Sequence, residues 1–325
     1  MPGILVVGEV AGGSLTKLST EIATVARALS EAGGGEVRGI VVAEDPTAAA
    51  TELATFTGGP VTAVTAPDLA NVVAPQRIAT ELAANTADAS WILVGGTPDG
   101  RDVAGILSAL TGWPVLTNAT AVTLADGRPV VEMSVFGGKL VTHSTFTGEH
   151  GIVTVRPNAV DASPAASAGS VEPAPASGED RVPAVKVVER IAEAGAEASL
   201  EEARVVVAGG RGVAGPDGFR IVEELAKELG GVVGATRAAV DSGWIPYARQ
   251  IGQTGKIVKP ALYLALGVSG AIQHKVGMQT AETIVAINRD PDAPIAEFAD
   301  LVVIGDLFEV GPALAAEIRA RRGSG

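Results

Sequence analysis

Residues 204–215 read RVVVAGGRGVAG, in which a run of branched apolar residues leads directly into a glycine-rich turn. The run has the length and composition of a strand that is buried on both faces of a parallel sheet. Apolar residues from Phe219 to Leu229 then recur at helical spacing, so the turn joins a strand to an amphipathic helix. A strand, a tight turn and a helix in this order predict an α/β fold.

Further short apolar runs follow this unit toward the C-terminus. Together with the first, the predicted strands are residues 204–208, 232–236, 261–266, 283–287 and 301–304. Five parallel strands with helices between them are typical of a doubly wound, Rossmann-like sheet. We expect this sheet to form a C-terminal domain that spans residues 201–325.

The N-terminal half repeats the alternation of strand and helix. The run ILVVG at residues 4–8 predicts a buried strand, and apolar residues at helical spacing follow between Leu18 and Leu29. Further strands are predicted at 39–43, 61–64 and 91–94, a helix at 103–110, and antiparallel strands at 130–135 and 139–142. We therefore expect an N-terminal α/β domain, residues 1–200, with a parallel sheet and antiparallel additions.

Pro, Ala, Ser and Gly dominate residues 157–183, which contain almost no large apolar side chains. Such a segment buries too little surface to offset the entropy that a chain loses when it becomes ordered. We expect an exposed linker or flexible loop there.

Composition excludes several classes of function. The chain has no cysteine, which excludes disulfides, cysteine-ligated metals and thiol catalysis, and its three histidines include no closely spaced pair for a metal site. The formal net charge of −13 disfavours a general nucleic-acid-binding role. No run approaches the ~20 apolar residues that span a bilayer. The start at Met1 lacks the basic region of a signal peptide, so we expect a cytoplasmic protein.

The turn after the first strand of the C-terminal domain matches G-x-G-x-x-G at residues 210–215. Glycines in such a turn let backbone N–H groups approach a pyrophosphate, whose charge a helix N-terminus also favours. An NAD-binding unit would end its second strand with an acidic residue, whereas this strand ends in Thr236 and Arg237. The arginine could bind the 2′-phosphate of NADP or lie against another electron-rich group, so the motif leaves two interpretations open.

Two later segments carry the features of anion-binding turns. Gly252–Lys256 is a polar loop bracketed by glycines, and Gly267–His274 runs from the end of a strand into a predicted helix. Ser269 is expected to be the N-cap of that helix, and the free N–H groups beside it suit a phosphate. Two such turns in one domain indicate an extended dinucleotide.

Structural roles are the alternatives for several of these residues. His274 could be a capping or packing histidine, Asp306 could cap the following helix, and Arg211 could be a surface charge. In the N-terminal domain, the loop Gly95–Asp102 lacks the Lys-Ser/Thr of a P-loop and predicts ordinary turn and cap chemistry. No catalytic residue and no metal site is predicted.

Six ordered segments of the C-terminal half resemble electron-transfer flavoprotein α subunits. They are GGRG at 209–212, RAAVD at 237–241, QIGQTGK at 250–256, GVSGAIQH at 267–274, IVAIN at 284–288 and DLF at 306–308. These segments cover nearly all of residues 204–310. The N-terminal half resembles the family only in the order of its elements.

This resemblance implies FAD as the cofactor and a set of residues that contact it. The implied contacts are Arg211, Thr236, Arg237, Ile251, Gly252, Gln253, Thr254, Ser269, Gly270, Ala271, Ile272, Gln273, His274, Asn288, Asp306 and Leu307. Position 236 is commonly serine in the family, and threonine keeps the hydroxyl. Asn288 and Asp306 are implied to serve the adenosine end of the cofactor.

The resemblance also implies roles around the flavin ring. Arg237 would lie against the ring, where a permanent cation stabilises the anionic reduced form and raises the reduction potential. Thr254 would offer its hydroxyl to the N5 region, and His274 would face the C2 carbonyl. Ser269 and the backbone at 270–271 would hold phosphate.

The function implied by the family is electron transfer without turnover of a substrate. FAD would accept electrons from flavin dehydrogenases, such as the acyl-CoA dehydrogenases of fatty acid β-oxidation, and deliver them to a membrane quinone oxidoreductase or another acceptor. The chain would form an αβ heterodimer with a β subunit that usually binds AMP. An electron-bifurcating member of the family would share the same FAD site. The alternative is an NADP-dependent oxidoreductase or a transhydrogenase-like subunit, suggested by residues 210–215 together with Arg237.

Overall fold

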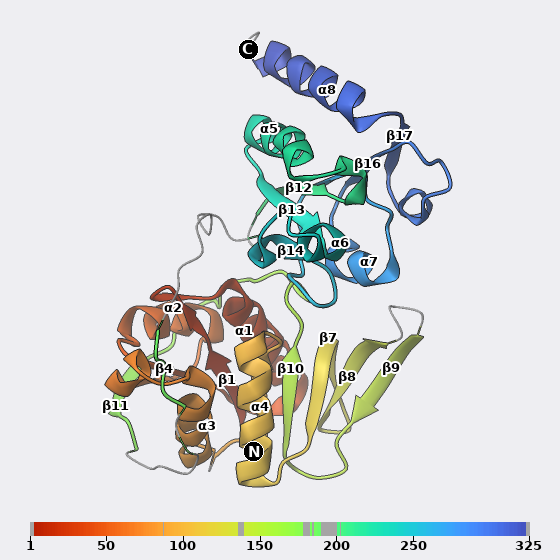
Figure 1. Cartoon of the computed structure of the whole chain (residues 1–325). Coiled ribbons are helices and arrows are strands. Elements are labelled where there is room, and N and C mark those ends of the chain that lie inside the picture. Colours follow the sequence, from red (N-terminus) through yellow and green to blue (C-terminus); the bar gives the residue numbers. More distant parts are fainter. Residues whose placement is uncertain are drawn as a thin grey trace. The chain divides into compact units, whose positions relative to one another are not determined.

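The structure is a computed structural model of the 325-residue chain and describes residues 3–86, 88–135, 140–177, 183, 185–189, 200–201 and 203–322. The chain divides into two compact units, Met1–Ile191 and Ala192–Gly325 (Figure 1). Each unit is built around a sheet of its own. In the described part of the chain, no helix has the length and apolar character needed to cross a membrane.

Nine described strands form the sheet of the first unit, in the order β11-β5-β4-β1-β6-β10-β7-β8-β9. The strands from β11 to β7 pair in parallel, and β8 and β9 follow as antiparallel additions, which confirms the predicted sheet type. The strands are β1 (Ile4–Gly8), β4 (Val37–Ala43), β5 (Val61–Thr65), β6 (Trp91–Gly95), β7 (Val115–Ala125), β8 (Arg128–Val135), β9 (Leu140–Thr145), β10 (Gly151–Val155) and β11 (Val171–Pro175).

Helices cover both faces of this sheet because successive strand residues point to opposite sides. Ile4 and Val6 pack in a core with α1 and α2, whereas Leu5 and Val7 pack in a second core with α3 and α4. The helices are α1 (Lys17–Leu29), α2 (Thr47–Thr57), α3 (Ala74–Ala84) and α4 (Pro98–Thr111), with short helices η1 (Ser30–Gly34) and η2 (Pro67–Ala70). A small hairpin of β2 (Val10–Ala11) and β3 (Ser14–Leu15) separates β1 from α1.

Strand β11 lies within residues 157–183, where composition predicts a linker or loop. It pairs in parallel with β5 at the edge of the sheet, from Val171 opposite Val61 to Pro175 opposite Thr65. An edge strand needs backbone hydrogen bonds on one side only, so it tolerates proline and requires few buried side chains. For this reason the composition of the segment does not reveal the strand. Residues 178–182 of the predicted linker lie outside the described residues.

The sheet of the second unit has the order β14-β13-β12-β15-β16-β17, and all its neighbouring strands are parallel. The five predicted strands are present, and the two-residue strand β14 adds to them. The strands are β12 (Val205–Gly209), β13 (Val232–Thr236), β14 (Gln250–Ile251), β15 (Leu262–Leu266), β16 (Ile284–Asn288) and β17 (Leu301–Ile304).

Two cores on opposite faces of this sheet confirm the doubly wound arrangement. Val207 and Leu264 pack with α5 and α8, whereas Val206 and Tyr263 pack against the segment that carries α7. The helices are α5 (Phe219–Leu229), α6 (Arg237–Asp241), α7 (Ile272–Met278) and α8 (Leu307–Arg322), with short helices η4 (Arg211–Val213), η5 (Pro216–Gly218), η6 (Tyr247–Arg249) and η7 (Pro294–Glu297).

Candidate functional site

The candidate site lies at the carboxyl edge of the second sheet. Because the strands are parallel, the loops that follow them meet at this edge. Strand β12 continues to β13 on one side, whereas β15 continues to β16 on the other, so the winding reverses between β12 and β15. Neighbouring loops diverge at such a point and leave room for a ligand. All predicted contact residues lie at or just after the carboxyl ends of these strands.

Glycines bring the loops after β12 and β15 into backbone contact. The Gly210 N–H donates to the Leu266 carbonyl at 2.9 Å, and the Gly212 N–H donates to the Gly267 carbonyl at 3.0 Å. A Cβ on Gly210 would lie 2.3 Å from the Gly267 oxygen, and a Cβ on Gly212 would lie 2.6 Å from the Gly267 Cα. These N–H groups are therefore committed to protein acceptors, which corrects the expectation that they approach a pyrophosphate.

The turn at residues 269–271 has the features of an anion-binding turn. Gly270 has a φ of +81°, and a Cβ there would lie 2.4 Å from the Ile295 nitrogen, so the turn requires glycine. Within the described part of the chain, the N–H groups of Ser269, Gly270 and Ala271 donate to no backbone acceptor. Successive free N–H groups in a turn of this kind form a concave site for an anion.

The predicted capping role of Ser269 is wrong. Helix α7 begins at Ile272, and its N-cap is Ala271, without a side-chain cap bond. The left-handed conformation of Gly270 inserts a turn between Ser269 and the helix. The Ser269 hydroxyl therefore does not cap α7.

Thr236 ends β13 with an unpaired polar group. Its hydroxyl oxygen is buried and has no hydrogen-bond partner among the residues that the structure describes. A buried hydroxyl without a partner costs about 1–3 kcal/mol, and such groups are rare unless a ligand or water completes them. The orphaned hydroxyl therefore points to a ligand at the carboxyl end of β13.

Two arginines add positive charge to the same edge. Arg237 is the first residue of α6, and its Nε bonds the Asp241 carboxylate at 3.2 Å. The Arg237 side chain is 66% exposed, and a guanidinium carries four further N–H donors besides Nε. Arg211 lies exposed on η4, directly after β12. Both cations are placed where an anionic ligand at this edge can meet them.

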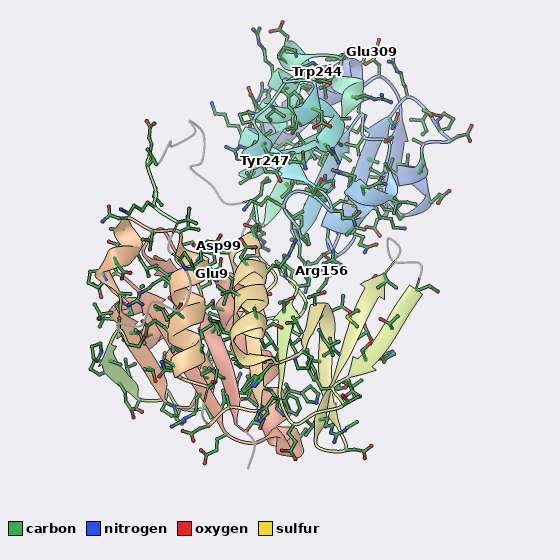
Figure 2. All side chains as sticks on the ribbon, turned by 60° about the horizontal axis from the view of Figure 1, so that its bottom comes forward. Glu9, Asp99, Arg156, Trp244, Tyr247 and Glu309 are labelled. Atoms are coloured by element: carbon green, nitrogen blue, oxygen red, sulfur yellow. The ribbon has the colours of Figure 1, made fainter. Side chains whose placement is uncertain are left out.

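The loop after β14 is held by hydrogen bonds to its neighbours. The Gln253 N–H donates to the Gln273 carbonyl at 2.7 Å, which ties the loop to α7. The Thr254 hydroxyl accepts from the Gln250 side chain at 3.1 Å, so its own proton remains available to donate. The Tyr247 hydroxyl, on the residue labelled in Figure 2, donates to the Thr254 carbonyl at 2.6 Å. Residues 251–254 are therefore fixed in place, with the Thr254 hydroxyl able to donate to a ligand.

The His274 side chain packs against loop 251–254 and is not exposed to solvent. The ring is buried, and its two nitrogens lie 3.0 Å from the Ile251 carbonyl and 2.8 Å from the Tyr263 hydroxyl. The carbonyl can only accept, so Nδ1 carries the proton, and Nε2 accepts from the tyrosine. Burial lowers the pKa of His274 to about 4, although the bond to Ile251 opposes this shift, so the ring is neutral at pH 7.

This geometry corrects the predicted role of His274. Its single ring proton is given to the Ile251 carbonyl, so no N–H is left to meet a flavin carbonyl. The packing alternative describes the observed contacts, and through them His274 positions the residue that opens the loop 251–254.

The last predicted contacts stabilise neighbouring loops. The Asn288 side chain donates to the Val268 carbonyl at 3.0 Å, which joins the end of β16 to the loop after β15. The Asp306 carboxylate accepts the Phe308 N–H at 2.8 Å at the start of α8, so the capping alternative is the one observed. Leu307 is buried in the core beside α5.

Three residues that support the site were not among the predicted contacts, although Gln250 opens the segment QIGQTGK. Tyr263, Tyr247 and Gln250 hold His274 and Thr254 through side-chain hydrogen bonds. Tyr263 lies within the apolar strand β15, so the hydrophobic pattern does not distinguish it from an ordinary core residue. Its distinguishing sign is a phenol hydroxyl in a fully buried position, which requires a partner.

Comparison with known proteins identifies the family of both units. A family model described as the electron transfer flavoprotein domain matches residues 4–192, and one described as the electron transfer flavoprotein FAD-binding domain matches residues 199–279. The electron transfer flavoprotein subunit alpha of Mycobacterium leprae is 44% identical over 332 residues, covering 99% of this chain and 100% of that protein. The subunits alpha of Bacillus subtilis and Paracoccus denitrificans are each 36% identical over 97% of this chain, and these alignments cover 97% and 99% of the two proteins.

These matches span both units and include the FAD-binding domain that contains the glycine contact, Thr236 and the turn at 269–271. The cofactor of the second unit is accordingly FAD. The chain belongs to the α subunits of the electron transfer flavoprotein family.

Proposed function

We propose that this protein is a cytoplasmic electron carrier that turns over no substrate of its own. Its FAD would receive electrons from flavin dehydrogenases, such as the acyl-CoA dehydrogenases of fatty acid β-oxidation, and pass them to a quinone oxidoreductase or another respiratory acceptor. The chain would act as one half of an αβ heterodimer whose β subunit binds AMP. When bound, FAD supplies the capacity to accept electrons in pairs and release them singly.

The orphaned hydroxyl of Thr236 is the observation that carries this proposal. It is a buried polar group that the described part of the chain leaves without a partner, at the carboxyl end of β13, the strand next to β12. The adjacent Arg237 supplies a cation with donors to spare, and the turn at 269–271 supplies N–H groups for the diphosphate. Loop 251–254 adds the Thr254 hydroxyl as a further donor. Hydroxyl, cation and N–H donors together suit a dinucleotide with an electron-accepting ring.

Co-purification of this chain with the β subunit tests the proposal directly. We expect a yellow αβ complex with a flavin absorption spectrum that bleaches when an acyl-CoA dehydrogenase and its substrate are added. If the protein is instead an NADP-dependent oxidoreductase, the complex should be colourless and should bind NADPH tightly. Tight NADPH binding by a complex that neither retains nor takes up FAD would overturn the proposal.

Thr236→Val separates a ligand-binding role from a structural one. Because the hydroxyl has no protein partner, its removal is expected to leave the unfolding free energy of the flavin-depleted complex unchanged or raised by up to about 1 kcal/mol. FAD affinity is expected to fall about fivefold, since one hydrogen bond contributes about 1 kcal/mol. Equilibrium titration with FAD and urea unfolding measure the two effects. Thr280→Val is the control, because the Thr280 hydroxyl donates to the Val258 carbonyl and is not among the predicted contacts. Equal FAD affinity in both variants would remove Thr236 from the site.

Arg237→Ala is expected to lower the two-electron reduction potential of the flavin by about 30 mV, which corresponds to a tenfold change in equilibrium constant. The physical reason is the loss of a cation that favours the anionic reduced flavin over the neutral oxidised form. The effect should shrink at high ionic strength, because the side chain is largely exposed.

Arg321→Ala is a matched control for this measurement. Arg321 is also exposed and pairs with the carboxylate four residues away on its own helix, that of Glu317 at 2.8 Å, but it lies in the last turn of α8, at the end far from the loop after β17. Arg237→Lys should retain most of the potential because it retains the charge. If redox titration gives the same potential for Arg237→Ala and Arg321→Ala, the guanidinium of Arg237 does not act on the flavin.

A further inference from the structure

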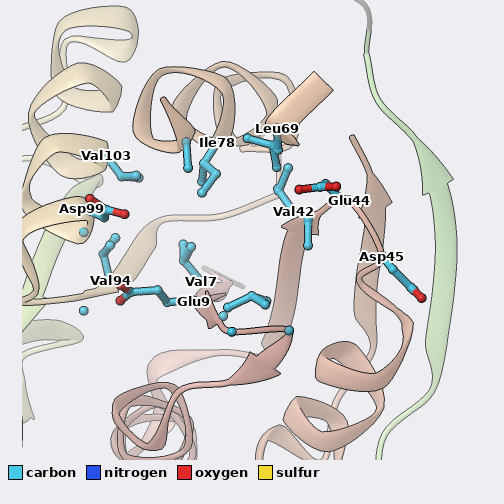
Figure 3. A pocket seen from close by; sticks show the side chains of 18 of the residues that line it. Val7, Glu9, Val42, Glu44, Asp45, Leu69, Ile78, Val94, Asp99 and Val103 are labelled. Carbon is cyan, nitrogen blue, oxygen red and sulfur yellow. The ribbon is translucent and has the colours of Figure 1, made fainter. Parts of the chain in front are cut away.

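The first unit contains a cavity of about 580 Å³ at the carboxyl edge of its own sheet (Figure 3). It lies where β1, β4 and β6 end, and it is lined on the other side by residues of α3 and α4. Strand β1 continues to β4 on one side and β6 continues beyond β10 to β7 on the other, so the winding reverses between β1 and β6. A cavity of this size at such a reversal has the place and volume of a small-molecule site.

The walls of the cavity are apolar on the side of the sheet and of α3. Figure 3 shows the side chains of Val7, Val42, Leu69, Ile78, Val94 and Val103 around the hollow. These residues belong to the core shared by the sheet, α3 and α4 or pack against it. A ligand would therefore place an apolar body, such as the face of a heterocyclic base, against them.

The polar lining is acidic. Its acidic residues are Glu9, Glu44, Asp45 and Asp99, and none of the described lining residues is Lys, Arg or His. Glu44 and Asp99 are exposed at the rim and have no ion-pair or hydrogen-bond partner among the described residues. Carboxylates accept hydrogen bonds from hydroxyl and amino groups and repel anions.

The cavity offers a phosphate no basic side chain among its described lining residues. Helix α4 reaches the cavity with its first turn, but Asp99 already lies in that turn, and the Thr97 hydroxyl takes the Gly100 N–H at 2.9 Å. The hairpin β2–β3, and not the N-terminus of α1, follows β1 at the cavity wall. The arrangement therefore offers a phosphate group no uncapped helix terminus, and the acidic lining repels its charge.

We propose that this cavity binds a nucleoside that carries no phosphate. Its base would lie on the apolar wall, and its ribose hydroxyls would donate to the Glu44 carboxylate. An acidic residue after the second strand of a βαβ unit binds ribose hydroxyls in this way, and Glu44 directly follows β4, the second strand of the unit β1-α1-β4. The site is separate from the FAD site and does not depend on it.

Isothermal titration of the FAD-loaded αβ complex with adenosine tests this proposal. We expect adenosine to bind at one site that maps to this cavity, and AMP to bind that site about tenfold more weakly because of the neighbouring carboxylates. Ile78→Trp should abolish the site by filling it. Ile106→Trp is the matched control, because Ile106 packs against the same core without lining the cavity.

A second pair of variants tests the ribose contact. Glu44→Gln should weaken adenosine binding about fivefold, whereas Asp45→Asn should leave it unchanged. Asp45 is a suitable control because, although the residue lines the cavity, its carboxylate accepts the Thr47 N–H at 3.1 Å at the start of α2 and points away from the cavity in Figure 3. The flavin spectrum reports separately on the FAD site in every variant.

Three results with adenosine and AMP would overturn the proposal. They are no adenosine binding at millimolar concentration, adenosine binding that survives Ile78→Trp, and AMP binding that equals adenosine binding at the site that Ile78→Trp removes. Tight binding of an aromatic amine such as tryptamine in place of adenosine would also overturn it, since the site would then select positive charge. None of these results depends on whether the second unit carries electrons.

Discussion

Gly210→Ala is expected to lower the unfolding free energy of the second unit by about 2–3 kcal/mol and to weaken FAD binding at least about tenfold. The added methyl would lie 2.3 Å from the Gly267 oxygen and 2.7 Å from the Val268 Cα. Both neighbours are backbone atoms, which cannot move aside as a flexible side chain does. The loop after β15 must shift, and with it the turn at 269–271 that is proposed to hold the diphosphate.

Urea unfolding and retention of flavin during gel filtration measure these two effects. Gly105→Ala is the control, because a Cβ at Gly105 meets no atom within 4 Å and the position is an exposed part of α4. Alanine there should stabilise the helix by roughly 0.5–1 kcal/mol. If Gly210→Ala unfolds at the wild-type urea concentration and keeps its flavin, the loops after β12 and β15 do not require this close approach.

The glycine contact shows how far a motif predicts a site. The spacing of glycines at residues 210–215 correctly indicates a tight turn between a strand and a helix. The motif assigns the N–H groups to a phosphate, but the observed acceptors are the carbonyls of Leu266 and Gly267. Those acceptors lie more than 50 residues along the chain, so the local sequence contains no information about them.

The fold follows from the sequence where strands are long and buried. Continuous apolar runs such as that of β1 predict their strands well, because burial on both faces leaves a clear pattern. Strand β14 has two residues, and β11 contains two prolines at the edge of a sheet. Such strands are held by backbone hydrogen bonds, which leave little trace in side-chain composition.

The sequence predicts which loops carry the candidate residues, but it does not predict the contacts that individual side chains make. Every predicted contact lies at the carboxyl edge of the second sheet, because parallel strands bring their following loops together. The orientation of His274 could not be predicted, since it depends on the hydroxyl of Tyr263 and the carbonyl of Ile251. These partners come from two other strands, and only the folded chain places them on the two ring nitrogens.

His274 is expected to make the second unit less stable in mild acid. In the folded protein its pKa is lowered to about 4, against an ordinary value of 6.5 in the unfolded chain. Between these pH values the unfolded state binds a proton that the folded state does not. The contribution of His274 to the unfolding free energy is therefore fully present above pH 6.5 and is lost as the pH falls toward 4. The loss should reach about 3 kcal/mol of unfolding free energy, which is the free-energy equivalent of the difference between the two pKa values.

Urea unfolding at a series of pH values from 7.5 to about 4.5 measures this loss, and two variants assign it to His274. His274→Gln should remove most of the pH dependence between about pH 6.5 and 5, whereas His143→Gln, at an exposed position of β9 in the first unit, should retain it. Tyr263→Phe should cost about 1–3 kcal/mol at pH 7.5, because it leaves Nε2 buried without a donor. It should also displace the loop that begins at Ile251 and so weaken FAD binding. A pH dependence that persists unchanged in His274→Gln would show that other groups, such as carboxylates, cause it.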